Sequence, residues 1–358
     1  MREYRIAVYA GDGIGIEVTT EALKALRAVE ARCGFRLKTT ELPWGSAWST
    51  AHGGHVAPAD FLDILRPFDA VFLGALGMPS VVPDHICLVP LIRMRQAFDQ
   101  YVCLRPATLL EGATTPLAGK GPGDIDLMVV RENSEGEYTA TGGHFRVNTP
   151  DEVSVQTAIH TRKGVERILR YGFDLARQRR HRLTMATKSN ALNYSMVMWD
   201  RVLAAVAPDY PDVVSEKVHV DALAMHFVRT PERFDVVVAS NLFGDILSDL
   251  AGALVGSLGL AASANINPER IYPSLFEPVH GSAPDIAGKG IANPMAAVRS
   301  AGLMLNFLGE GEAGAILENA VADVVREGRV LTPDLGGRAS TGDVGDAVAA
   351  RVAVTQPS

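Results

Sequence analysis

The sequence lacks the features that mark membrane, secreted and nucleic-acid-binding proteins. Its 358 residues include only three cysteines, Cys33, Cys87 and Cys103, at spacings that fit neither a disulfide framework nor a zinc site. Apolar runs are interrupted well before the roughly 18 residues that a membrane span needs. The net charge is −7, whereas nucleic-acid binding needs a clustered basic surface. We expect free thiols in a reducing compartment, and neither a nucleic-acid nor a membrane partner.

The start of the chain lacks a recognisable targeting segment, because residues 1–4 lead directly into a strand-like run and leave no room for a signal peptide. A cytoplasmic location is therefore expected. Apolar residues make up 47% of the chain, which is enough to bury a large core. The length exceeds what one core usually supports, so two domains are expected.

The opening residues are typical of an α/β unit. Residues 4–10 form a strand pattern, Gly11–Gly15 a glycine turn, and residues 17–31 a helical pattern. The dinucleotide fingerprint G-x-G-x-x-G fails, since Ile16 occupies the place of its third glycine. Strands alternating with helical patterns predict a parallel sheet covered by helices. Further strands are expected at 37–42, 70–74, 101–104, 125–131, 183–187, 217–220 and 235–239, and the chain end, 354–358, is expected to fray.

Two aspartates carry the strongest chemical signal. A buried strand pattern at 235–239 leads through a polar turn into a short helix that carries Asp245 and Asp249. A spacing of four puts both carboxylates on one helical face, where they repel each other and favour a bound cation. Oxygen ligands suit Mg²⁺ or Mn²⁺ better than zinc. The alternative is a solvated helix face. A third acid after a strand-like run, Asp221, favours the metal site.

Three arginines and two proton-carrying residues complete the candidate chemistry. Arg95 lies in a helical segment, Arg105 precedes a proline at a strand end, and Arg131 ends a strand. Each alone is more typical of a surface ion pair, but together with a metal they indicate a small polycarboxylate ligand, because guanidinium groups bind carboxylates with two hydrogen bonds. Tyr138 and Lys188 beside a metal would transfer protons, with lowered pKa values.

A long loop at 276–294 is punctuated by glycine and proline, and loops of this length inside compact domains are usually functional. Asp285 within it can accept hydrogen bonds from a ribose diol, which favours NAD over NADP. A plain surface loop is the alternative.

The motifs together resemble a known family, the metal-dependent decarboxylating dehydrogenases of 2-hydroxy acids, which includes isocitrate, 3-isopropylmalate, tartrate and D-malate dehydrogenases. The similarity runs from about residue 6 to residue 308. It rests on GDGIG at 11–15, the arginines Arg95 and Arg105, RENSEGEY at 131–138, TKSNAL at 187–192, VDAL at 220–223, NLFGDILSDL at 241–250 and EPVHGSAPDIAGKGIANP at 277–294.

The resemblance implies an α/β, two-domain isopropylmalate-dehydrogenase-like fold with parallel or mixed sheets and no Rossmann fingerprint. Residues 1–100 plus 251–358 would form a discontinuous first domain that carries most of the NAD site. Residues 101–250 would form the second, with the dimer interface and the metal and substrate residues. The implied assembly is a homodimer with active sites shared between its subunits.

The resemblance also implies a role for each candidate residue. Arg95, Arg105 and Arg131 would bind the substrate, a small dicarboxylic hydroxy acid. Asp245 and Asp249, with Asp221 of the other subunit, would bind Mg²⁺ or Mn²⁺. Lys188, also from the other subunit, would accept the hydroxyl proton, and Tyr138 would protonate the enolate. The implied NAD contacts are Asn190, His280, Asp285, Ile286 and Asn293.

In the family that the chain resembles, the choice of acid rests on the helix that ends at the first arginine, here residues 84–95. Pro83-Asp84-His85 and the run at 98–101 resemble the tartrate and D-malate group, whereas Cys87 and Val89 depart from it. The leading prediction is an NAD-linked D-malate or tartrate dehydrogenase. The alternative is a 3-isopropylmalate or other 3-substituted malate dehydrogenase, whose apolar pocket would be supplied by Leu88, Leu91 and Ile92. A catalytically silent nucleotide-binding protein is the alternative from another class, but no candidate catalytic or metal residue is missing.

Overall fold

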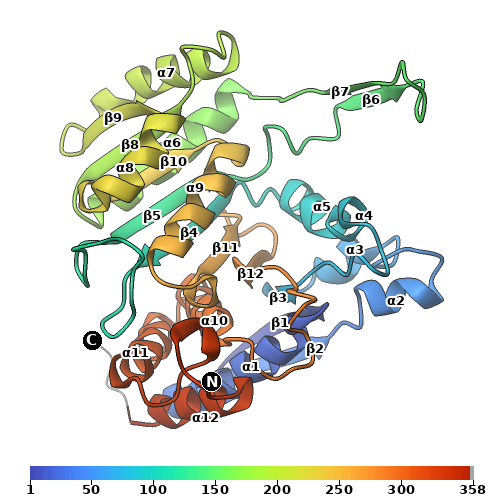
Figure 1. Ribbon diagram of the computed structural model, residues 1–358, viewed down its shortest axis with the longest axis vertical. Helices are drawn as coiled ribbons and strands as arrows, with labels where there is room; N and C mark the ends of the chain where they lie inside the picture. The colour runs from blue at the N-terminus through green and yellow to red at the C-terminus, as the bar shows by residue number, and fades with distance from the viewer. Residues whose placement is uncertain (355–358) are drawn as a thin grey trace.

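A ten-stranded sheet crosses the whole molecule (Figure 1). The structure, a computed structural model, describes residues 1–354, so most of the end expected to fray lies outside it. The strand order is β2-β1-β3-β12-β11-β4-β5-β10-β8-β9, and a separate hairpin pairs β6 with β7. The strands are β1 (Arg2–Gly11), β2 (Phe35–Glu41), β3 (Ala70–Ala75), β4 (Val102–Thr108), β5 (Asp126–Glu132), β6 (Gly142–Phe145), β7 (Val153–Gln156), β8 (Arg182–Thr187), β9 (Val214–His219), β10 (Val236–Ala239), β11 (Ala262–Ile266) and β12 (Ser274–Pro278).

The sheet is mostly parallel with an antiparallel centre, so the α/β fold with parallel or mixed sheets that the family resemblance implied is confirmed. Strand pairs toward both ends are parallel. At the centre, β11 is antiparallel to both β12 and β4, and β4 is antiparallel to β5. Neither β11 nor β12 was predicted: β11 alternates but has a single β-branched residue among small and polar ones, and β12 shows no alternation of apolar and polar residues. Their insertion brings distant segments of the chain together.

Helices cover both faces of the sheet, and the strand side chains alternate accordingly. Ile6 and Val8 of β1 pack into the largest core cluster, while Tyr9 packs into the cluster on the opposite face. Within residues 1–354, no helix is long and apolar enough to cross a membrane. The helices are α1 (Ile14–Cys33), α2 (Ser46–Ala51), α3 (Phe61–Leu65), α4 (Asp84–Cys87), α5 (Val89–Ala97), α6 (Arg162–Arg177), α7 (Ser195–Val206), α8 (Val220–Arg229), α9 (Asn241–Leu254), α10 (Met295–Leu308), α11 (Gly311–Glu327) and α12 (Thr341–Val352).

Two sequence-based expectations about local structure need correction. Residues 84–95, expected to form one helix, form the end-to-end helices α4 and α5, because Pro90 lies in the first turn of α5 and lacks the N–H of a helix interior. Arg105 lies in the middle of β4, which continues through Pro106 to Thr108. The three cysteines carry free thiols, as predicted.

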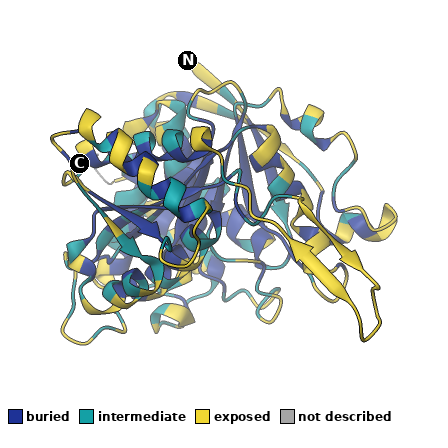
Figure 2. Ribbon diagram, turned by 90° about the horizontal axis from the view of Figure 1, so that it is seen from above, coloured by how far each residue is buried: buried dark blue, intermediate teal, exposed yellow. Residues whose placement is uncertain are grey.

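The hairpin β6–β7 projects from the body as an arm whose residues are all exposed (Figure 2). Its apolar side chains remain uncovered, with Phe145 72% and Val155 52% exposed. Exposed apolar groups gathered in one element mark contact surfaces in soluble proteins. The arm therefore requires a structural explanation that a single chain does not supply.

Asp235, at the entrance to β10, accepts hydrogen bonds from Nε of Arg179 at 2.7 Å and from the backbone N–H of Arg180 at 2.8 Å. Its side chain is fully buried. The residues that follow α6 thus tie its end to β10. Loss of Asp235 would remove these buried, charge-assisted hydrogen bonds and leave Arg179 with Asp126 as its remaining acidic partner.

We predict that Asp235→Ala lowers the free energy of unfolding by about 3 kcal/mol, because Arg179 loses a buried partner. The exposed pair of Arg177 with Asp212 supplies a matched control, and Asp212→Ala should cost much less than Asp235→Ala. Chemical denaturation of both variants measures the difference. Equal losses would contradict the assignment of Asp235 as a buried anchor.

Candidate functional site

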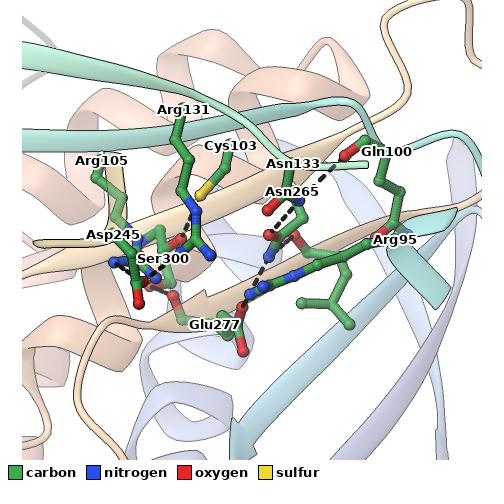
Figure 3. A network of polar contacts seen from close by, with 12 residues as sticks. Arg95, Gln100, Cys103, Arg105, Arg131, Asn133, Asp245, Asn265, Glu277 and Ser300 are labelled. Atoms are coloured by element: carbon green, nitrogen blue, oxygen red, sulfur yellow. Dashed lines mark hydrogen bonds and ion pairs between the residues drawn. The ribbon is translucent and has the colours of Figure 1, made fainter. Parts of the chain in front are cut away.

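The three arginines expected to bind carboxylates meet in one pocket of about 330 Å³. Arg95 comes from α5, Arg105 from β4 and Arg131 from β5. All three are buried, with 7%, 7% and 1% exposure. Figure 3 shows Arg105 and Arg131 beside Asp245, and Arg95 beside Glu277. The antiparallel strands at the centre of the sheet make this meeting possible.

Asp245 and Asp249 lie on the α9 face that looks onto the arginines, as their spacing predicted. Nη1 of Arg105 lies 3.3 Å from Oδ1 of each carboxylate. Asp245 also pairs with Nη1 of Arg131 and accepts a hydrogen bond from the hydroxyl of Tyr138 at 3.0 Å. The Asp249 side chain is still 58% exposed and lines the pocket. These acidic oxygens are hard ligands, so the donor set fits Mg²⁺ or Mn²⁺.

The two carboxylates differ in their affinity for protons. Burial raises the pKa of Asp249. Burial acts in the same direction on Asp245, but Arg131 and Arg105 outweigh it and hold the pKa of Asp245 below its usual value. Burial and the neighbouring Arg105 lower the pKa of Arg131 to about 10. Asp245 is therefore the more firmly ionised member of the pair.

Tyr138 has a raised pKa, because its ring is half-buried and its hydroxyl faces the Asp245 carboxylate. Burial and Asp245 outweigh the opposite effect of Arg131 on this pKa, and the lowering expected beside a bound metal stays a prediction. A protonated phenol at this position suits a proton donor.

Sequence reasoning missed three residues that hold the arginines. Asn241, at the start of α9, accepts hydrogen bonds from Nε and Nη2 of Arg131 at 3.0 and 2.6 Å. Ser248 accepts one from Nη1 of Arg105 at 2.7 Å. Glu277, on β12, pairs with Arg95 at 2.9 Å. The available signal for the first two was their spacing from Asp245 on one helix, four residues before it and three after it. Glu277 opens the motif at 277–294, but its position beside Arg95 was not indicated, because β12 was not recognised.

Lys188 and Asp221 lie away from this pocket. Lys188 follows β8 and Asp221 lies in the first turn of α8, and the two form an ion pair at 2.5 Å. Neither lines the pocket, and within residues 1–354 no three His, Cys, Asp or Glu residues are grouped to hold a metal. One chain thus does not bring the third aspartate to Asp245 and Asp249.

The expected NAD residues lie mostly on the loop between β12 and α10. Asp285 is exposed, while Ile286 packs against the core. His280 lines the pocket, burial lowers its pKa, and its Nε2 is buried without a hydrogen-bond partner. An uncharged imidazole with an unpaired nitrogen and an open acidic side chain fit a nucleotide with a ribose diol. Asn190 is exposed in the turn after β8, at a distance along the chain from this loop.

The structure gives Asn293 and the glycine turn roles that the sequence did not reveal. Asn293 is buried, and its side chain already bonds to the backbone N–H of Met295 and to Asp334, both at 3.0 Å. The glycine turn contacts the loop between β12 and α10: the N–H of Ile14 donates to the carbonyl of Ser282 at 2.9 Å. A Cβ on Gly13 would lie 2.1 Å from that carbonyl oxygen, so only glycine fits there.

The sequence and the fold match known proteins. Residues 5–348 match the sequence profile of the family described as isocitrate/isopropylmalate dehydrogenase. A D-malate dehydrogenase [decarboxylating] of Escherichia coli (strain K12) is 51% identical, over 97% of this chain and 98% of the relative. A tartrate dehydrogenase/decarboxylase of Pseudomonas putida is 50% identical, over 96% of both chains. The crystal structure of isocitrate dehydrogenase from Methylococcus capsulatus is 38% identical, with a TM-score of 0.87 over 98% of this chain and 99% of that one.

The chain therefore belongs to the isocitrate/isopropylmalate dehydrogenase family. Its named relatives are decarboxylating dehydrogenases, so the predicted enzyme class is confirmed. The predicted similarity to the tartrate and D-malate group is also confirmed.

Gly244 of α9 allows the close contact between this helix and Arg131. A Cβ on Gly244 would lie 2.6 Å from Cβ and 2.7 Å from Cγ of Arg131. We predict that Gly244→Ala displaces Arg131 and lowers kcat/KM for the acid substrate roughly 10- to 100-fold, because small misplacements of binding groups are costly in catalysis. Steady-state kinetics with a saturating cofactor measures the change.

Gly252→Ala on the same helix is the matched control. Its added Cβ would meet Cδ2 of Leu258 at 2.8 Å, and that flexible side chain can move aside. We expect near-normal kinetics for this variant. Equal losses in both variants would indicate general damage to α9.

Proposed function

We propose that this chain catalyses the NAD-linked oxidative decarboxylation of a small malate-type acid, D-malate or tartrate, with Mg²⁺ or Mn²⁺. The observation that carries the proposal is the meeting of three buried arginines with an aspartate pair in one pocket. Nε of Arg95 and Nε of Arg105 are buried without an acceptor, as expected of groups that bind carboxylates. Relatives about 50% identical act, by name, on D-malate and tartrate.

The charges of the pocket favour a cation and a dianion that bind together. Its three guanidinium groups face three carboxylates, those of Asp245, Asp249 and Glu277. A divalent cation alone would leave an excess of positive charge in a largely buried site, and a dicarboxylate alone an excess of negative charge. Together they preserve the balance, which reduces the electrostatic cost of binding either one.

Each residue then has a chemical task. Arg95, Arg105 and Arg131 orient the acid through its carboxylates. Lys188 of a second copy of the chain accepts the hydroxyl proton as hydride leaves the carbon, and Tyr138 protonates the enolate carbon after CO₂ is lost. The divalent cation, held by Asp245 and Asp249 with Asp221 of that second copy, supplies Lewis acidity, and NAD supplies the hydride acceptor. Asn190, His280, Asp285, Ile286 and Asn293 are the proposed NAD contacts.

We further propose a cytoplasmic homodimer with shared sites and the two domains expected from the sequence, 1–100 plus 251–358 and 101–250. Lys188 and Asp221 have no task at the pocket of their own chain, but they have one at the pocket of a partner. The exposed apolar arm β6–β7 supports an additional contact between subunits, as does α8, on which Met225 is 47% exposed.

A second candidate substrate is favoured by the apolar wall of the pocket. Leu88, Leu91 and Ile92 all line it, so a 3-substituted malate such as 3-isopropylmalate would find an apolar surface for its substituent. Asp84 and His85 are exposed on α4 and do not line the pocket, and so do not decide the question. Arg93, on the same helix as Leu91 and Ile92, does not line the pocket. Its guanidinium stacks over Phe61, 5.2 Å from the ring centroid.

We predict NADH formation from D-malate or tartrate by protein that has been stripped of metal and resupplied with Mn²⁺ or Mg²⁺, and none without added metal. The expected order of kcat/KM places the small acids above 3-isopropylmalate. The reverse order would support the apolar-wall candidate. Silence toward all of these acids would reject both.

We predict that two inactive variants, Lys188→Ala and Tyr138→Phe, restore activity when their subunits are mixed. A mixed dimer contains one complete site, so random exchange should recover about a quarter of wild-type activity, given a twofold-symmetric dimer. The subunits are denatured, mixed and refolded together, and each variant refolded alone is the control. No recovery, with mixed dimers demonstrated by mass, would contradict shared sites.

A further inference from the structure

Arg95 belongs to a closed ring of hydrogen bonds (Figure 3). Oε1 of Glu277 accepts from Nη2 of Arg95 at 2.9 Å and from Nδ2 of Asn265 at 2.8 Å. Oδ1 of Asn265 accepts from Nδ2 of Asn133 at 2.9 Å. That same nitrogen donates to the backbone oxygen of Gln100 at 3.0 Å, and the N–H of Gln100 donates to the backbone oxygen of Arg95 at 2.8 Å. Arg95 is thus held by its backbone and by its side chain.

Every member of the ring is buried, with between 0% and 8% of its surface exposed. Asn265 is fully buried and uses both ends of its amide, accepting from Asn133 and donating to Glu277. The opposite amide orientation would place its oxygen against the Glu277 carboxylate, so the ring fixes the orientation. Loss of this side chain would remove one buried hydrogen bond from Glu277 and one from Asn133, so that Glu277 would keep its bond to Arg95 and Asn133 its bond to Gln100 without the link between them.

The ring joins three distant segments of the chain. The first segment is the last turn of α5, which carries Arg95, with Gln100 just beyond it. The second is the end of β5, which Asn133 follows. The third is the pair of neighbouring strands β11 and β12, which carry Asn265 and Glu277. Asn133 is two residues beyond Arg131, so the ring connects the backbone that carries one carboxylate-binding arginine to the backbone that carries another. The distance between those two arginines determines which dicarboxylate spans them.

We propose that Asn265 is a positioning residue for acid binding, which sets the guanidinium of Arg95 relative to Arg131 without touching the acid itself. The proposal rests on the proposed function, in which both arginines hold carboxylates of the substrate. Asn265 does not line the pocket, so its effect is transmitted through Glu277 and Asn133.

The experiment compares Asn265→Ala with a matched control, Asn267→Ala. Asn267 follows the same strand and is 2% exposed. Its amide also bonds at both ends, to the backbone of Asp99 at 3.1 Å and of Ile271 at 2.8 Å, but it is not part of the ring. Asn265→Ala should raise KM for D-malate about tenfold while KM for NAD and the affinity for NADH change by less than about twofold. Asn267→Ala should leave all three near wild type.

Asn133→Ala opens the same ring at a different hydrogen bond and can be tested if Asn265→Ala does not fold. This variant should also raise KM for D-malate. Crystal structures provide a readout that needs no turnover: Arg95 should separate from Glu277 in Asn265→Ala and remain paired in Asn267→Ala. If wild-type protein oxidises none of the acids, the proposed function fails, and the ring is judged by the position of Arg95 alone. An unmoved Arg95, or a moved Arg95 with unchanged KM for D-malate, would overturn the proposal.

Discussion

The burial of three guanidinium groups in one pocket is the constraint on which the rest of the site depends. Removing such charges from water costs several kcal/mol each unless hydrogen bonds and opposite charges compensate. Arg131 forms an ion pair with Asp245 and a hydrogen bond with Asn241, and Arg95 forms an ion pair with Glu277. Arg105 shares the two aspartates and has Ser248 as its closest partner. The path of α9 along the sheet, including the close contact at Gly244, follows from this need for compensation.

The compensation of these charges is incomplete. Two guanidinium Nε–H groups remain unpaired, while the Asp249 carboxylate is largely open to solvent. Complete internal pairing would have been more stable, but it would have left nothing to bind a ligand. A site of this kind gives up part of its folding stability and recovers it when a cation and a dianion bind, which couples stability to ligand concentration.

Much of this site could be predicted from the sequence because its signals are local. The spacing of Asp245 and Asp249 places them on one face of a helix whatever the rest of the chain does. Arg131, at the end of an apolar strand pattern, was recognisable for the same reason. The outer strands of the sheet were predicted because their β-branched residues cluster in short runs. Each of these inferences uses fewer than ten neighbouring residues.

The rest depends on contacts between distant segments. The strands β11 and β12 carry few periodic cues, and without them nothing indicated that Asn265 and Glu277 lie beside Arg95. Two buried hydrogen bonds of one amide, 132 and 12 residues away along the chain, leave no trace in local composition. Such polar links are effective because the apolar interior makes any unpaired group expensive. The buried links therefore fix the positions of the arginines although no sequence pattern indicates them. Arg95 is held through its side chain by Glu277 and through its backbone by Gln100.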